Sequence, residues 1–345
     1  MKVDIIAFST KGCQKSLDIA GCFPEDEVNL FAKTTADSVG IEKVECSMRE
    51  WTERSFAECD AIVFVGAVGI AVREIAPFIR NKTVDPAVIS VDELGRFCIP
   101  ILSGHIGGAN GIAVRVAGHI GAVPVVTTAT DINGKIAIDA WAVNNDLSIV
   151  NLHAAKDVAA RILSGDPVGF VSDVPVKGDV PPELSADEAS TGVYVGNGDA
   201  RPFETTLRLV PRDCVLGIGC RRDTPEEDIE GMVSRALAEA GISMRNVRAA
   251  ASIDLKKDEA GLLAFASKHS LPITFYTADD LNAVPGEFSK SGFVQSVTAV
   301  DCVCERSAVK ASRGGRIILR KYAGDGVTVA IAREDFSVDF TRYRK

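Results

Sequence analysis

The stretch Leu102–Asp131, LSGHIGGANGIAVRVAGHIGAVPVVTTATD, decides the fold class and marks the first candidate site. Glycines surround His105 near its start, so the backbone there can adopt positive φ angles and present N–H groups that no Cβ shields. The apolar run 112–120 then predicts a helix, 123–126 a buried strand, and 127–131 a polar loop at the carboxyl end of that strand. Ligands bind at this end of the strands in open α/β sheets. We therefore expect a ligand-binding loop on a helix and strand framework.

A second loop of the same kind lies upstream, in AIVFVGAVGIAVREIAP at residues 61–77. A predicted strand at its start runs into Gly66 and Gly69 and then into a helix that carries Arg73. Glycines at such a junction let a ligand approach the backbone closely. This loop and the loop around His105 together predict one shared cleft.

Strand-like and helix-like segments alternate along the first part of the chain. The strand-like runs are 3–8, 61–65, 87–91 and 123–126. Alternation of this kind predicts an α/β fold with a parallel sheet.

The pattern changes in the middle of the chain and restarts after Pro211. A helix at 152–163, a strand at 168–172 and a loop-rich stretch at 175–199 predict a small α+β connecting module. Beyond Pro211 a strand at 214–220 leads to a helix with Thr224 as N-cap, Pro225 at the first helical position and carboxylates in the first turn. We therefore predict two α/β domains with mainly parallel sheets, at 1–145 and 212–345, joined by the module at 146–211.

Composition places the chain among globular proteins that bind small molecules. Its 345 residues are 46% hydrophobic and 25% charged, which is enough for a large core. The net charge of −9, with no dense basic run, argues against nucleic acid as a partner. No apolar stretch approaches the roughly 18 residues of a membrane helix. Nine cysteines without repeated spacing, and no signal peptide before Val3, predict reduced thiols in a cytoplasmic protein.

Familiar catalytic signatures are missing from the sequence. Neither a GxxxxGK[ST] phosphate loop nor the GxGxxG spacing occurs, which disfavours a nucleotide-dependent enzyme such as an NADP oxidoreductase. The four histidines are isolated from one another, and Cys302 and Cys304 stand only two apart, so no zinc ligand set is visible. Ser103 lacks the GxSxG setting of a hydrolase nucleophile.

Several polar residues stand at predicted strand ends, each with a functional and a structural interpretation. His105 lies in a glycine loop and could act as acid, base or metal ligand, or simply hydrogen-bond the loop. Asp131 could orient water or a ligand, or cap the next helix. In the pair Asp92–Glu93, adjacent side chains point apart, so at most one faces a cleft. Arg221–Arg222 could bind an anion or form a solvated turn.

As a group, these residues resemble the cobalt-precorrin-5A hydrolase (CbiG) family of the anaerobic cobalamin pathway. The matching motifs in the first half are GAVGIAVREIAP at 66–77, DPAVISVDELGRF at 85–97, LSGHIGGAN at 102–110 and PVVTTATD at 124–131. In the second half they are LGIGCRRDTP at 216–225, ASIDLKKDEAGL at 251–262 and VTVAIA at 327–332. This second half resembles the family's terminal domain, which also occurs as a free-standing protein of the aerobic pathway. The middle module carries little that matches.

The resemblance implies a reaction. Water opens the lactone that joins the ring A acetate to C20 of cobalt-precorrin-5A, and C20 leaves with its methyl group as acetaldehyde, giving cobalt-precorrin-5B. Such a site needs an activated water, donors for an oxyanion and a group that handles a proton. The hypothesis makes His105 or Asp131 the base, the N–H groups of Gly107 and Gly108 the oxyanion donors, and Glu93 a proton-transfer group.

The resemblance also implies how the substrate is held, in a cleft between the two α/β domains. The substrate carries the cobalt, so no cofactor or metal of the protein's own is expected. Transient contact with neighbouring enzymes of the pathway is a further expectation. The alternative is a noncatalytic carrier of a corrinoid intermediate. The expected substrate-binding residues are Gly66, Gly69, Arg73, Ser103, Gly104, Gly107, Gly108, Asn110, Thr127, Thr128, Thr130, Gly217, Gly219, Arg221, Arg222 and Lys257.

Overall fold

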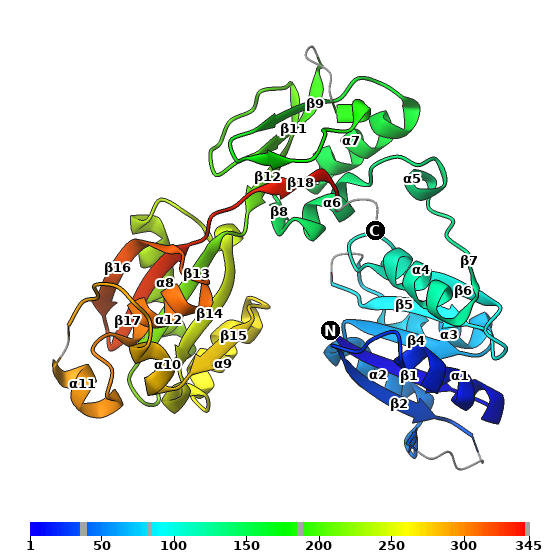
Figure 1. The fold of residues 1–345 in the computed structure, drawn as a ribbon, viewed down its shortest axis with the longest axis horizontal. Helices are drawn as coiled ribbons and strands as arrows, with labels where there is room; N and C mark the ends of the chain where they lie inside the picture. Colours follow the sequence, from blue (N-terminus) through cyan, green and yellow to red (C-terminus); the bar gives the residue numbers. More distant parts are fainter. Residues whose placement is uncertain (35–39, 82–83, 185–188, 291, 342–345) are drawn as a thin grey trace. The chain divides into compact units, whose positions relative to one another are not determined.

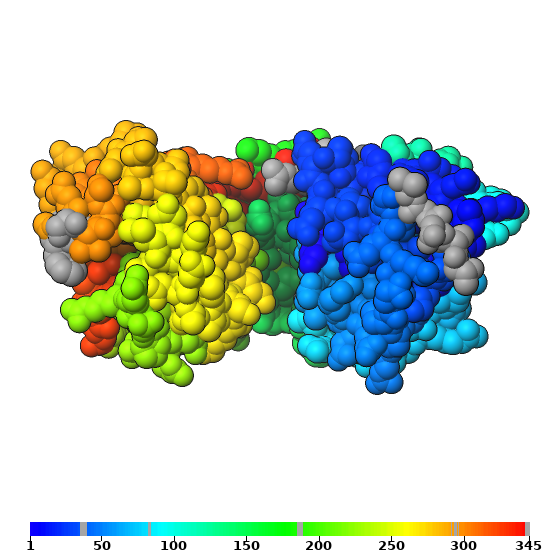
Figure 2. Space-filling view, turned by 90° about the horizontal axis from the view of Figure 1, so that it is seen from below, coloured from blue at the N-terminus to red at the C-terminus, as the bar shows by residue number. Residues whose placement is uncertain are grey.

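The computed structural model describes residues 1–34, 40–81, 84–184, 189–290 and 292–341. The chain forms two compact units (Figure 1). Among the described residues, the first unit holds Met1–Trp141 and Ile162–Asp166, and the second holds Ala142–Arg161 and 167–341. Figure 2 shows the packed surface of each unit, blue to cyan for the first and mostly yellow to red for the second. The division into three domains stays a prediction.

The first unit is built on a seven-stranded sheet with the order β3-β2-β1-β4-β5-β6-β7. Its central strands β4 and β5 are buried at every position, because helices cover both faces of the sheet. The sheet is parallel from β3 to β5. This confirms the predicted α/β class. The strands are β1 (Lys2–Ala7), β2 (Glu27–Ala32), β3 (Glu42–Lys43), β4 (Ala61–Val65), β5 (Ala87–Val91), β6 (Phe97–Leu102) and β7 (Val123–Pro124).

Alternate side chains of the strands pack into two hydrophobic cores, one on each face of the sheet. On one face, Ile5 packs with buried residues of α1 and α4; on the other, Ile6 packs with Trp51 of α2 and Ile75 of α3. The helices and turns of this part of the chain are α1 (Thr10–Ala20), α2 (Met48–Glu58), α3 (Val68–Ile75), η1 (Ala76–Phe78), α4 (Ala109–Ile120), α5 (Ala129–Ile132) and α6 (Ile138–Asn144).

Strand β6 runs antiparallel to β5, and this reverses the position of the loop that follows it. Val91 pairs with Cys98 and Val88 with Leu102. The turn between the strands is closed by Asp92, whose carboxylate accepts the backbone N–H groups of Leu94, Arg96 and Phe97. The loop after β6 therefore lies at the edge where β5 begins, whereas the Gly66 loop lies where β4 ends. The expectation that the two glycine loops share one cleft is wrong for this reason.

The segment after α4 also differs from its prediction. The expected buried strand 123–126 is reduced to Val123–Pro124, and both residues are exposed. Pro124 has no N–H to donate to a neighbouring strand, which limits pairing. The expected polar loop 127–131 contains a short helix, α5, which begins after Thr128.

The second unit contains two larger sheets, of four and five strands. The four-stranded sheet, β8-β12-β11-β9, includes Thr191–Val195, a fully buried strand inside the stretch expected to be loop-rich. The five-stranded sheet has the order β15-β14-β13-β17-β16. The strands are β8 (Leu147–Ile149), β9 (Gly169–Ser172), β10 (Val176–Lys177), β11 (Thr191–Val195), β12 (Thr205–Pro211), β13 (Cys214–Cys220), β14 (Val247–Ile253), β15 (Ile273–Tyr276), β16 (Arg316–Gly324), β17 (Val327–Arg333) and β18 (Val338–Asp339).

Helices pack on the five-stranded sheet as the sequence pattern indicates. Helix α8 begins one residue later than expected, with Pro225 as N-cap, and has three carboxylates in its first turn. The helices and turns of this part are α7 (Leu152–Ser164), η2 (Pro182–Leu184), α8 (Glu226–Glu239), η3 (Met244–Asn246), η4 (Asp254–Lys256), α9 (Ala260–Lys268), α10 (Ala278–Asn282), α11 (Gly292–Thr298) and α12 (Val303–Ala311). Among the described residues, none of the helices combines the length and apolar character that a bilayer crossing requires.

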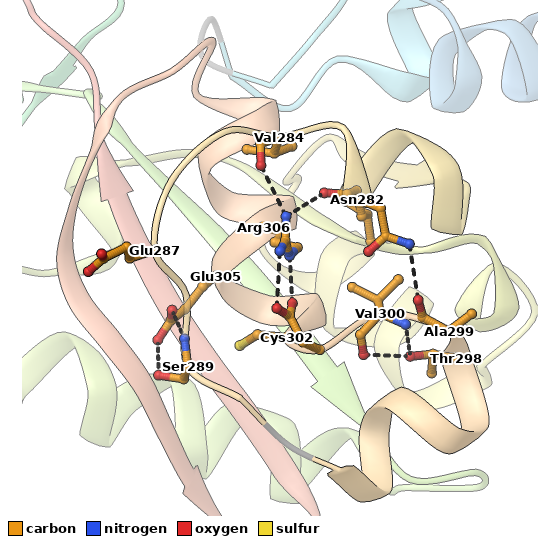
Figure 3. Close-up of polar contacts among 12 residues, drawn as sticks. Asn282, Val284, Glu287, Ser289, Thr298, Ala299, Val300, Cys302, Glu305 and Arg306 are labelled. Atoms are coloured by element: carbon orange, nitrogen blue, oxygen red, sulfur yellow. Dashed lines mark hydrogen bonds and ion pairs between the residues drawn. The ribbon is translucent and has the colours of Figure 1, made fainter.

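Two neighbouring charged residues of α12 fix the chain around them (Figure 3). Glu305 is fully buried, and its carboxylate accepts hydrogen bonds from the backbone and hydroxyl of Ser289 and from the N–H of Lys321. These three donors hold the pKa of Glu305 below its usual range against the effect of burial. Arg306 pairs with Asp301 and donates to the carbonyl of Val284. This cluster anchors the segment before α12.

The strand β18 returns to the middle of the chain. It pairs with β10, and Asn145 exchanges hydrogen bonds with the backbone of Asp339. Phe340 is buried and packs edge to face on Phe170. Figure 1 shows red β18 among the green elements of the middle segment. Residues 338–340 therefore complete the packing of a segment that lies more than 160 residues earlier in the sequence.

Candidate active site

The loop from Ser103 to Gly108 is held tightly by its own backbone and presents His105. The N–H groups of Ala109 and Asn110 donate to the carbonyls of Ser103 and Gly104, at 3.1 and 3.0 Å. Ser103 itself has a φ of 56°, an uncommon angle for a residue with a side chain. Its hydroxyl donates to the carbonyl of Asp85 at 2.9 Å, so Ser103 ties the loop to the start of β5.

His105 contacts three polar side chains that arrive from two later segments. Its Nε2 lies 3.1 Å from Oδ2 of Asp131 and 3.1 Å from the hydroxyl of Thr130, both in α5. Its Nδ1 lies 3.4 Å from Oδ1 of Asp139, in the first turn of α6. The structure therefore brings His105 and Asp131 together, as the hypothesis for the active site requires.

Asn110 supports this arrangement from the first turn of α4. Its Nδ2 donates to the hydroxyl of Thr128 and to Oδ2 of Asp131, each at 2.8 Å. A Cβ at position 104 would lie 2.8 Å from Oδ1 of Asn110, so Gly104 is needed to leave room for this amide. Asn110 is buried and acts as a support for Asp131 from behind.

The two carboxylates make His105 easier to protonate. Asp139, and then Asp131, raise the pKa of His105 above its ordinary 6.5, while burial of the ring opposes them. The side chains of His105 and Asp139 are 19% and 16% exposed, whereas that of Asp131 is 40% exposed. Asp131 is thus the member of the group that a ligand can reach most easily. An imidazole and an accessible carboxylate in contact can take up and release a proton.

Asp139 is the functional candidate that sequence reasoning missed. It follows Ile138 and precedes Trp141, both fully buried, in a segment that carries no glycine loop or strand end. Its acidic position in the first turn of a short helix is also what a structural cap would show. The sequence offers no signal that separates the two roles.

Other residues of the loop have structural roles that differ from the roles the hypothesis gives them. The N–H of Gly108 donates to the carbonyl of His105 at 3.0 Å, so it is not a free oxyanion donor. Gly108 has a φ of 82° and starts α4, which accounts for this glycine. A Cβ at position 107 would lie 2.4 Å from Cβ of Ser103, which accounts for Gly107. Thr127 is exposed near α5.

Glu93 is not part of this group. Its carboxylate accepts a hydrogen bond from Ser9 at 2.7 Å, beyond the carboxyl ends of β1 and β5. Because β5 spans the sheet between the two edges, Glu93 lies roughly 15 Å or more from His105, taking 3.3 Å per strand residue. The structure therefore does not bring Glu93 together with His105 and Asp131.

The surroundings of Glu93 form a pocket of their own, of about 420 Å³. It lies between β1 and β4, where the chain order of the sheet changes direction, which is the usual ligand position in open α/β sheets. Gly66 belongs to it, while Gly69 and the exposed Arg73 lie farther along α3. The lining residues are Phe8, Ser9, Val65, Gly66, Ala67, Ile70, Asp92, Glu93, Leu94 and Arg96.

The remaining expected substrate-binding residues lie in the second unit. Arg221, Arg222 and Lys257 are exposed, after β13 and after η4. Gly217 is buried: a Cβ there would lie 1.8 Å from the carbonyl oxygen of Cys304 in α12. Its missing side chain therefore serves the packing of α12 on β13, and its backbone cannot face a ligand. Gly219 is only partly buried, and a Cβ there would lie 2.7 Å from the side-chain hydroxyl of Thr328.

The expectation that the protein holds no metal of its own stays a prediction. In the part of the chain that the structure describes, no group of three or more His, Cys, Asp or Glu side chains could hold an ion. Cys302 and Cys304 are buried, with their sulfur atoms 3.7 Å apart.

Three family descriptions match successive parts of the chain. They are Cobalamin synthesis G N-terminal over residues 50–131, Cobalamin biosynthesis central region over 136–211 and Cobalamin synthesis G C-terminus over 214–332.

Individual proteins match over most of their length. The chain is 34% identical over 295 residues to the cobalt-precorrin-5A hydrolase of Salmonella typhimurium, covering 81% of this chain and 83% of that one. It is 29% identical over 351 residues to the same enzyme of Priestia megaterium, covering 95% and 94%. A solved cobalamin biosynthesis protein G homolog from Sulfolobus solfataricus aligns with a TM-score of 0.43 and 22% identity, over 96% of this chain and 97% of that one.

Proposed function

Because the chain belongs to the cobalt-precorrin-5A hydrolase (CbiG) family, we propose that it hydrolyses cobalt-precorrin-5A with His105 and Asp131 as its acid–base pair. The contact between these two side chains, at 3.1 Å, is the observation that supports this assignment. It joins two motifs that lie 26 residues apart in the sequence and meet only in the fold.

The proposed reaction has two steps. Water adds to the carbonyl carbon of the lactone, and the bond from that carbon to the C20 oxygen breaks, which leaves a carboxylic acid and a hydroxyl group on C20. The C20 hydroxyl then loses its proton, the bond between C20 and the ring breaks, and the electron pair stays on the ring, which takes up a proton. C20 leaves with its methyl group as acetaldehyde. One molecule of water is consumed for each acetaldehyde released.

The geometry suits proton transfer in both steps. Asp131, the more exposed of the two, takes the proton of the attacking water or of the C20 hydroxyl, and His105 supplies a proton to the atom that gains the electron pair. Thr130 and Asn110 hold the pair in place by hydrogen bonds. The N–H of Gly107 remains the proposed donor to the oxyanion.

The metal in this proposal belongs to the substrate. Cobalt within the macrocycle withdraws electrons from the breaking bond, so the chain itself needs only to bind and orient the ring. Arginine side chains match carboxylates well, and Arg73, Arg221 and Arg222 are the proposed partners of the substrate's carboxylates. Neighbouring enzymes of the pathway are proposed to meet the protein only transiently.

The test is acetaldehyde release. Purified protein is incubated anaerobically with cobalt-precorrin-5A, acetaldehyde is trapped, and the mass of the macrocycle is measured. We expect one acetaldehyde per substrate and the matching mass loss, and a fall of about 10²–10⁴-fold when His105 is replaced by glutamine. His153→Gln is the matched control, because His153 is 91% exposed and far along the chain from the site. Tight binding with no acetaldehyde would leave a corrinoid carrier instead.

A further inference from the structure

We propose that Asp139 is a positioning residue that holds the Nδ1 proton of His105, so that Nε2 is the nitrogen that exchanges protons at the candidate active site. The inference rests on the proposed hydrolase function and adds a residue to it.

The two ring nitrogens of His105 face two different carboxylates. Oδ1 of Asp139 lies 3.4 Å from Nδ1, and Oδ2 of Asp131 lies 3.1 Å from Nε2. In a neutral imidazole one nitrogen carries the proton and the other carries a lone pair, and the partner of one nitrogen decides the state of the other. A lone pair on either nitrogen would face a carboxylate and repel it, but at Nε2 the hydroxyl of Thr130, 3.1 Å away, can donate a hydrogen bond to the lone pair. Asp139 therefore favours the form with the proton on Nδ1.

Exposure separates the roles of the two carboxylates. The side chain of Asp139 is 16% exposed, while that of Asp131 is 40% exposed. Asp131, which contacts Nε2, is thus easier for a ligand to reach than Asp139, which contacts Nδ1. The hydroxyl of Thr130 also lies at Nε2, at 3.1 Å, and can serve as donor or acceptor there. We therefore place proton exchange with a substrate on the Nε2 side of the ring, where Asp131 lies.

The fold fixes Asp139 by its neighbours in the chain. Ile136, Ile138 and Trp141 are each at most 1% exposed, so the backbone on both sides of Asp139 is anchored in a core. Oδ1 of Asp139 also accepts the N–H of Ala140 at 2.9 Å. A side chain held in this way loses little conformational freedom when it orients His105, which is what a positioning residue requires.

The substitution that tests this role is Asp139→Asn, which keeps the size of the side chain and removes its charge. In serine proteases the same change at the aspartate behind the histidine lowers kcat about 10⁴-fold, because the imidazole adopts the wrong tautomer. The contact between Nδ1 of His105 and Asp139, at 3.4 Å, is longer than the roughly 2.8 Å of a strong hydrogen bond to a carboxylate. We therefore expect a smaller fall, of about 10²–10³-fold in kcat for acetaldehyde release, with KM changed less than about threefold. A loss of folding alone would lower the active fraction without changing the tautomer of the folded molecules.

The direct readout is ¹⁵N NMR of protein with labelled imidazole rings. The chain has four histidines, and His105→Gln identifies the signals of His105. In the wild-type protein, above the pKa of His105, we expect the proton on Nδ1; in Asp139→Asn we expect it to move wholly or partly to Nε2. Asp157→Asn is the control, because Asp157 lies 3.0 Å from Nδ1 of the exposed His153, and it should change neither the His105 signals nor kcat.

Each outcome decides the inference. A wild-type His105 with its neutral proton on Nε2 overturns it without any variant, and so does an Asp139→Asn protein with unchanged tautomer and unchanged kcat. If the wild-type protein releases no acetaldehyde, the proposed function fails, while the wild-type NMR signals still decide whether Asp139 holds the Nδ1 proton.

Discussion

Replacing Gly217 by alanine should destabilise the second unit and leave the first unit unchanged. The added Cβ would lie 1.8 Å from the carbonyl oxygen of Cys304 and 2.8 Å from the backbone nitrogen of Ala308. Ordinary contact distances need about 3.5 Å, so α12 would have to move by about 1.7 Å against β13. The obstacle is helix backbone, which cannot rotate away as a side chain can.

The magnitude follows from this overlap. Inserting a methyl group into a packed core costs about 1–3 kcal/mol, and a backbone obstacle places Gly217→Ala at about 3 kcal/mol. The unfolded chain loses freedom when glycine becomes alanine, which offsets about 0.5–1 kcal/mol of this cost. We expect a net loss of about 2 kcal/mol, which lowers the urea midpoint by about 1 M at an m-value of about 2 kcal/mol/M.

The chain allows the two units to be followed separately. Trp51 is buried in a core of the first unit, whereas Trp141 lies in α6 at the boundary of the two units, so in a Trp141→Phe background tryptophan fluorescence reports on the first unit and far-UV circular dichroism on both. The fluorescence transition should stay in place while the circular dichroism transition acquires a component at lower urea. Gly231→Ala is the matched control: this glycine lies inside α8 with nothing within 4 Å of an added Cβ, and should gain about 1 kcal/mol. A Gly217→Ala protein that unfolds like the wild type would refute the close packing of α12 on β13.

Three further predictions concern the protonation of His105, the pocket around Glu93 and the thiols. Because the folded state raises the pKa of His105 above 6.5, the stability that its protonation contributes should be fully present below about pH 6.5 and lost as the pH rises through the folded-state pKa; urea unfolding of wild type and His105→Gln over this range measures it. Glu93→Gln should lower kcat less than tenfold and Asp131→Asn about 10²-fold or more, since Glu93 lies at the other edge of the sheet; an equal loss in both would contradict the separation of the two sites. Of the nine cysteines, all within the described residues, Cys46 is exposed, Cys220 is partly exposed and the other seven are buried, so a thiol reagent should modify Cys46 rapidly and Cys220 more slowly in the folded protein, and the other seven only on unfolding.

The sequence located the chemistry of the site better than its geometry. His105 and Asp131 stood out because glycines and a run of threonines gave them functional settings, and the fold brings them together. Glu93 was grouped with them because 97–102, FCIPIL, was not recognised as a strand: Pro100 interrupts it, and proline is rare within sheets. One unrecognised strand reverses the direction of the chain, which moves the loops after β6 and β7 to the other edge.

Other differences come from tertiary packing that a single sequence does not display. Gly217 stands in a glycine-rich strand end, a setting shared by ligand-binding loops and by close helix packing, and only the position of α12 distinguishes them. Asp139 gains its role from the side chain of His105, 34 residues earlier, and not from its own neighbours. The α/β class depended on strong local patterns of buried residues and was correspondingly easier to predict.

Residues 338–340 pack on the middle of the chain, so the middle segment can finish folding only after the end of the chain has been synthesised. A ribosome adds about 5–20 residues per second, so on the order of ten to thirty seconds pass between the synthesis of β10 and that of its partner β18. During this time Phe170 lacks the ring of Phe340 that packs on it, and the backbone of Val176 and Lys177 lacks the strand with which it pairs. The middle segment therefore leaves the ribosome before it can finish folding, and the surface that Phe340 and β18 later cover needs protection from aggregation while the rest of the chain is made.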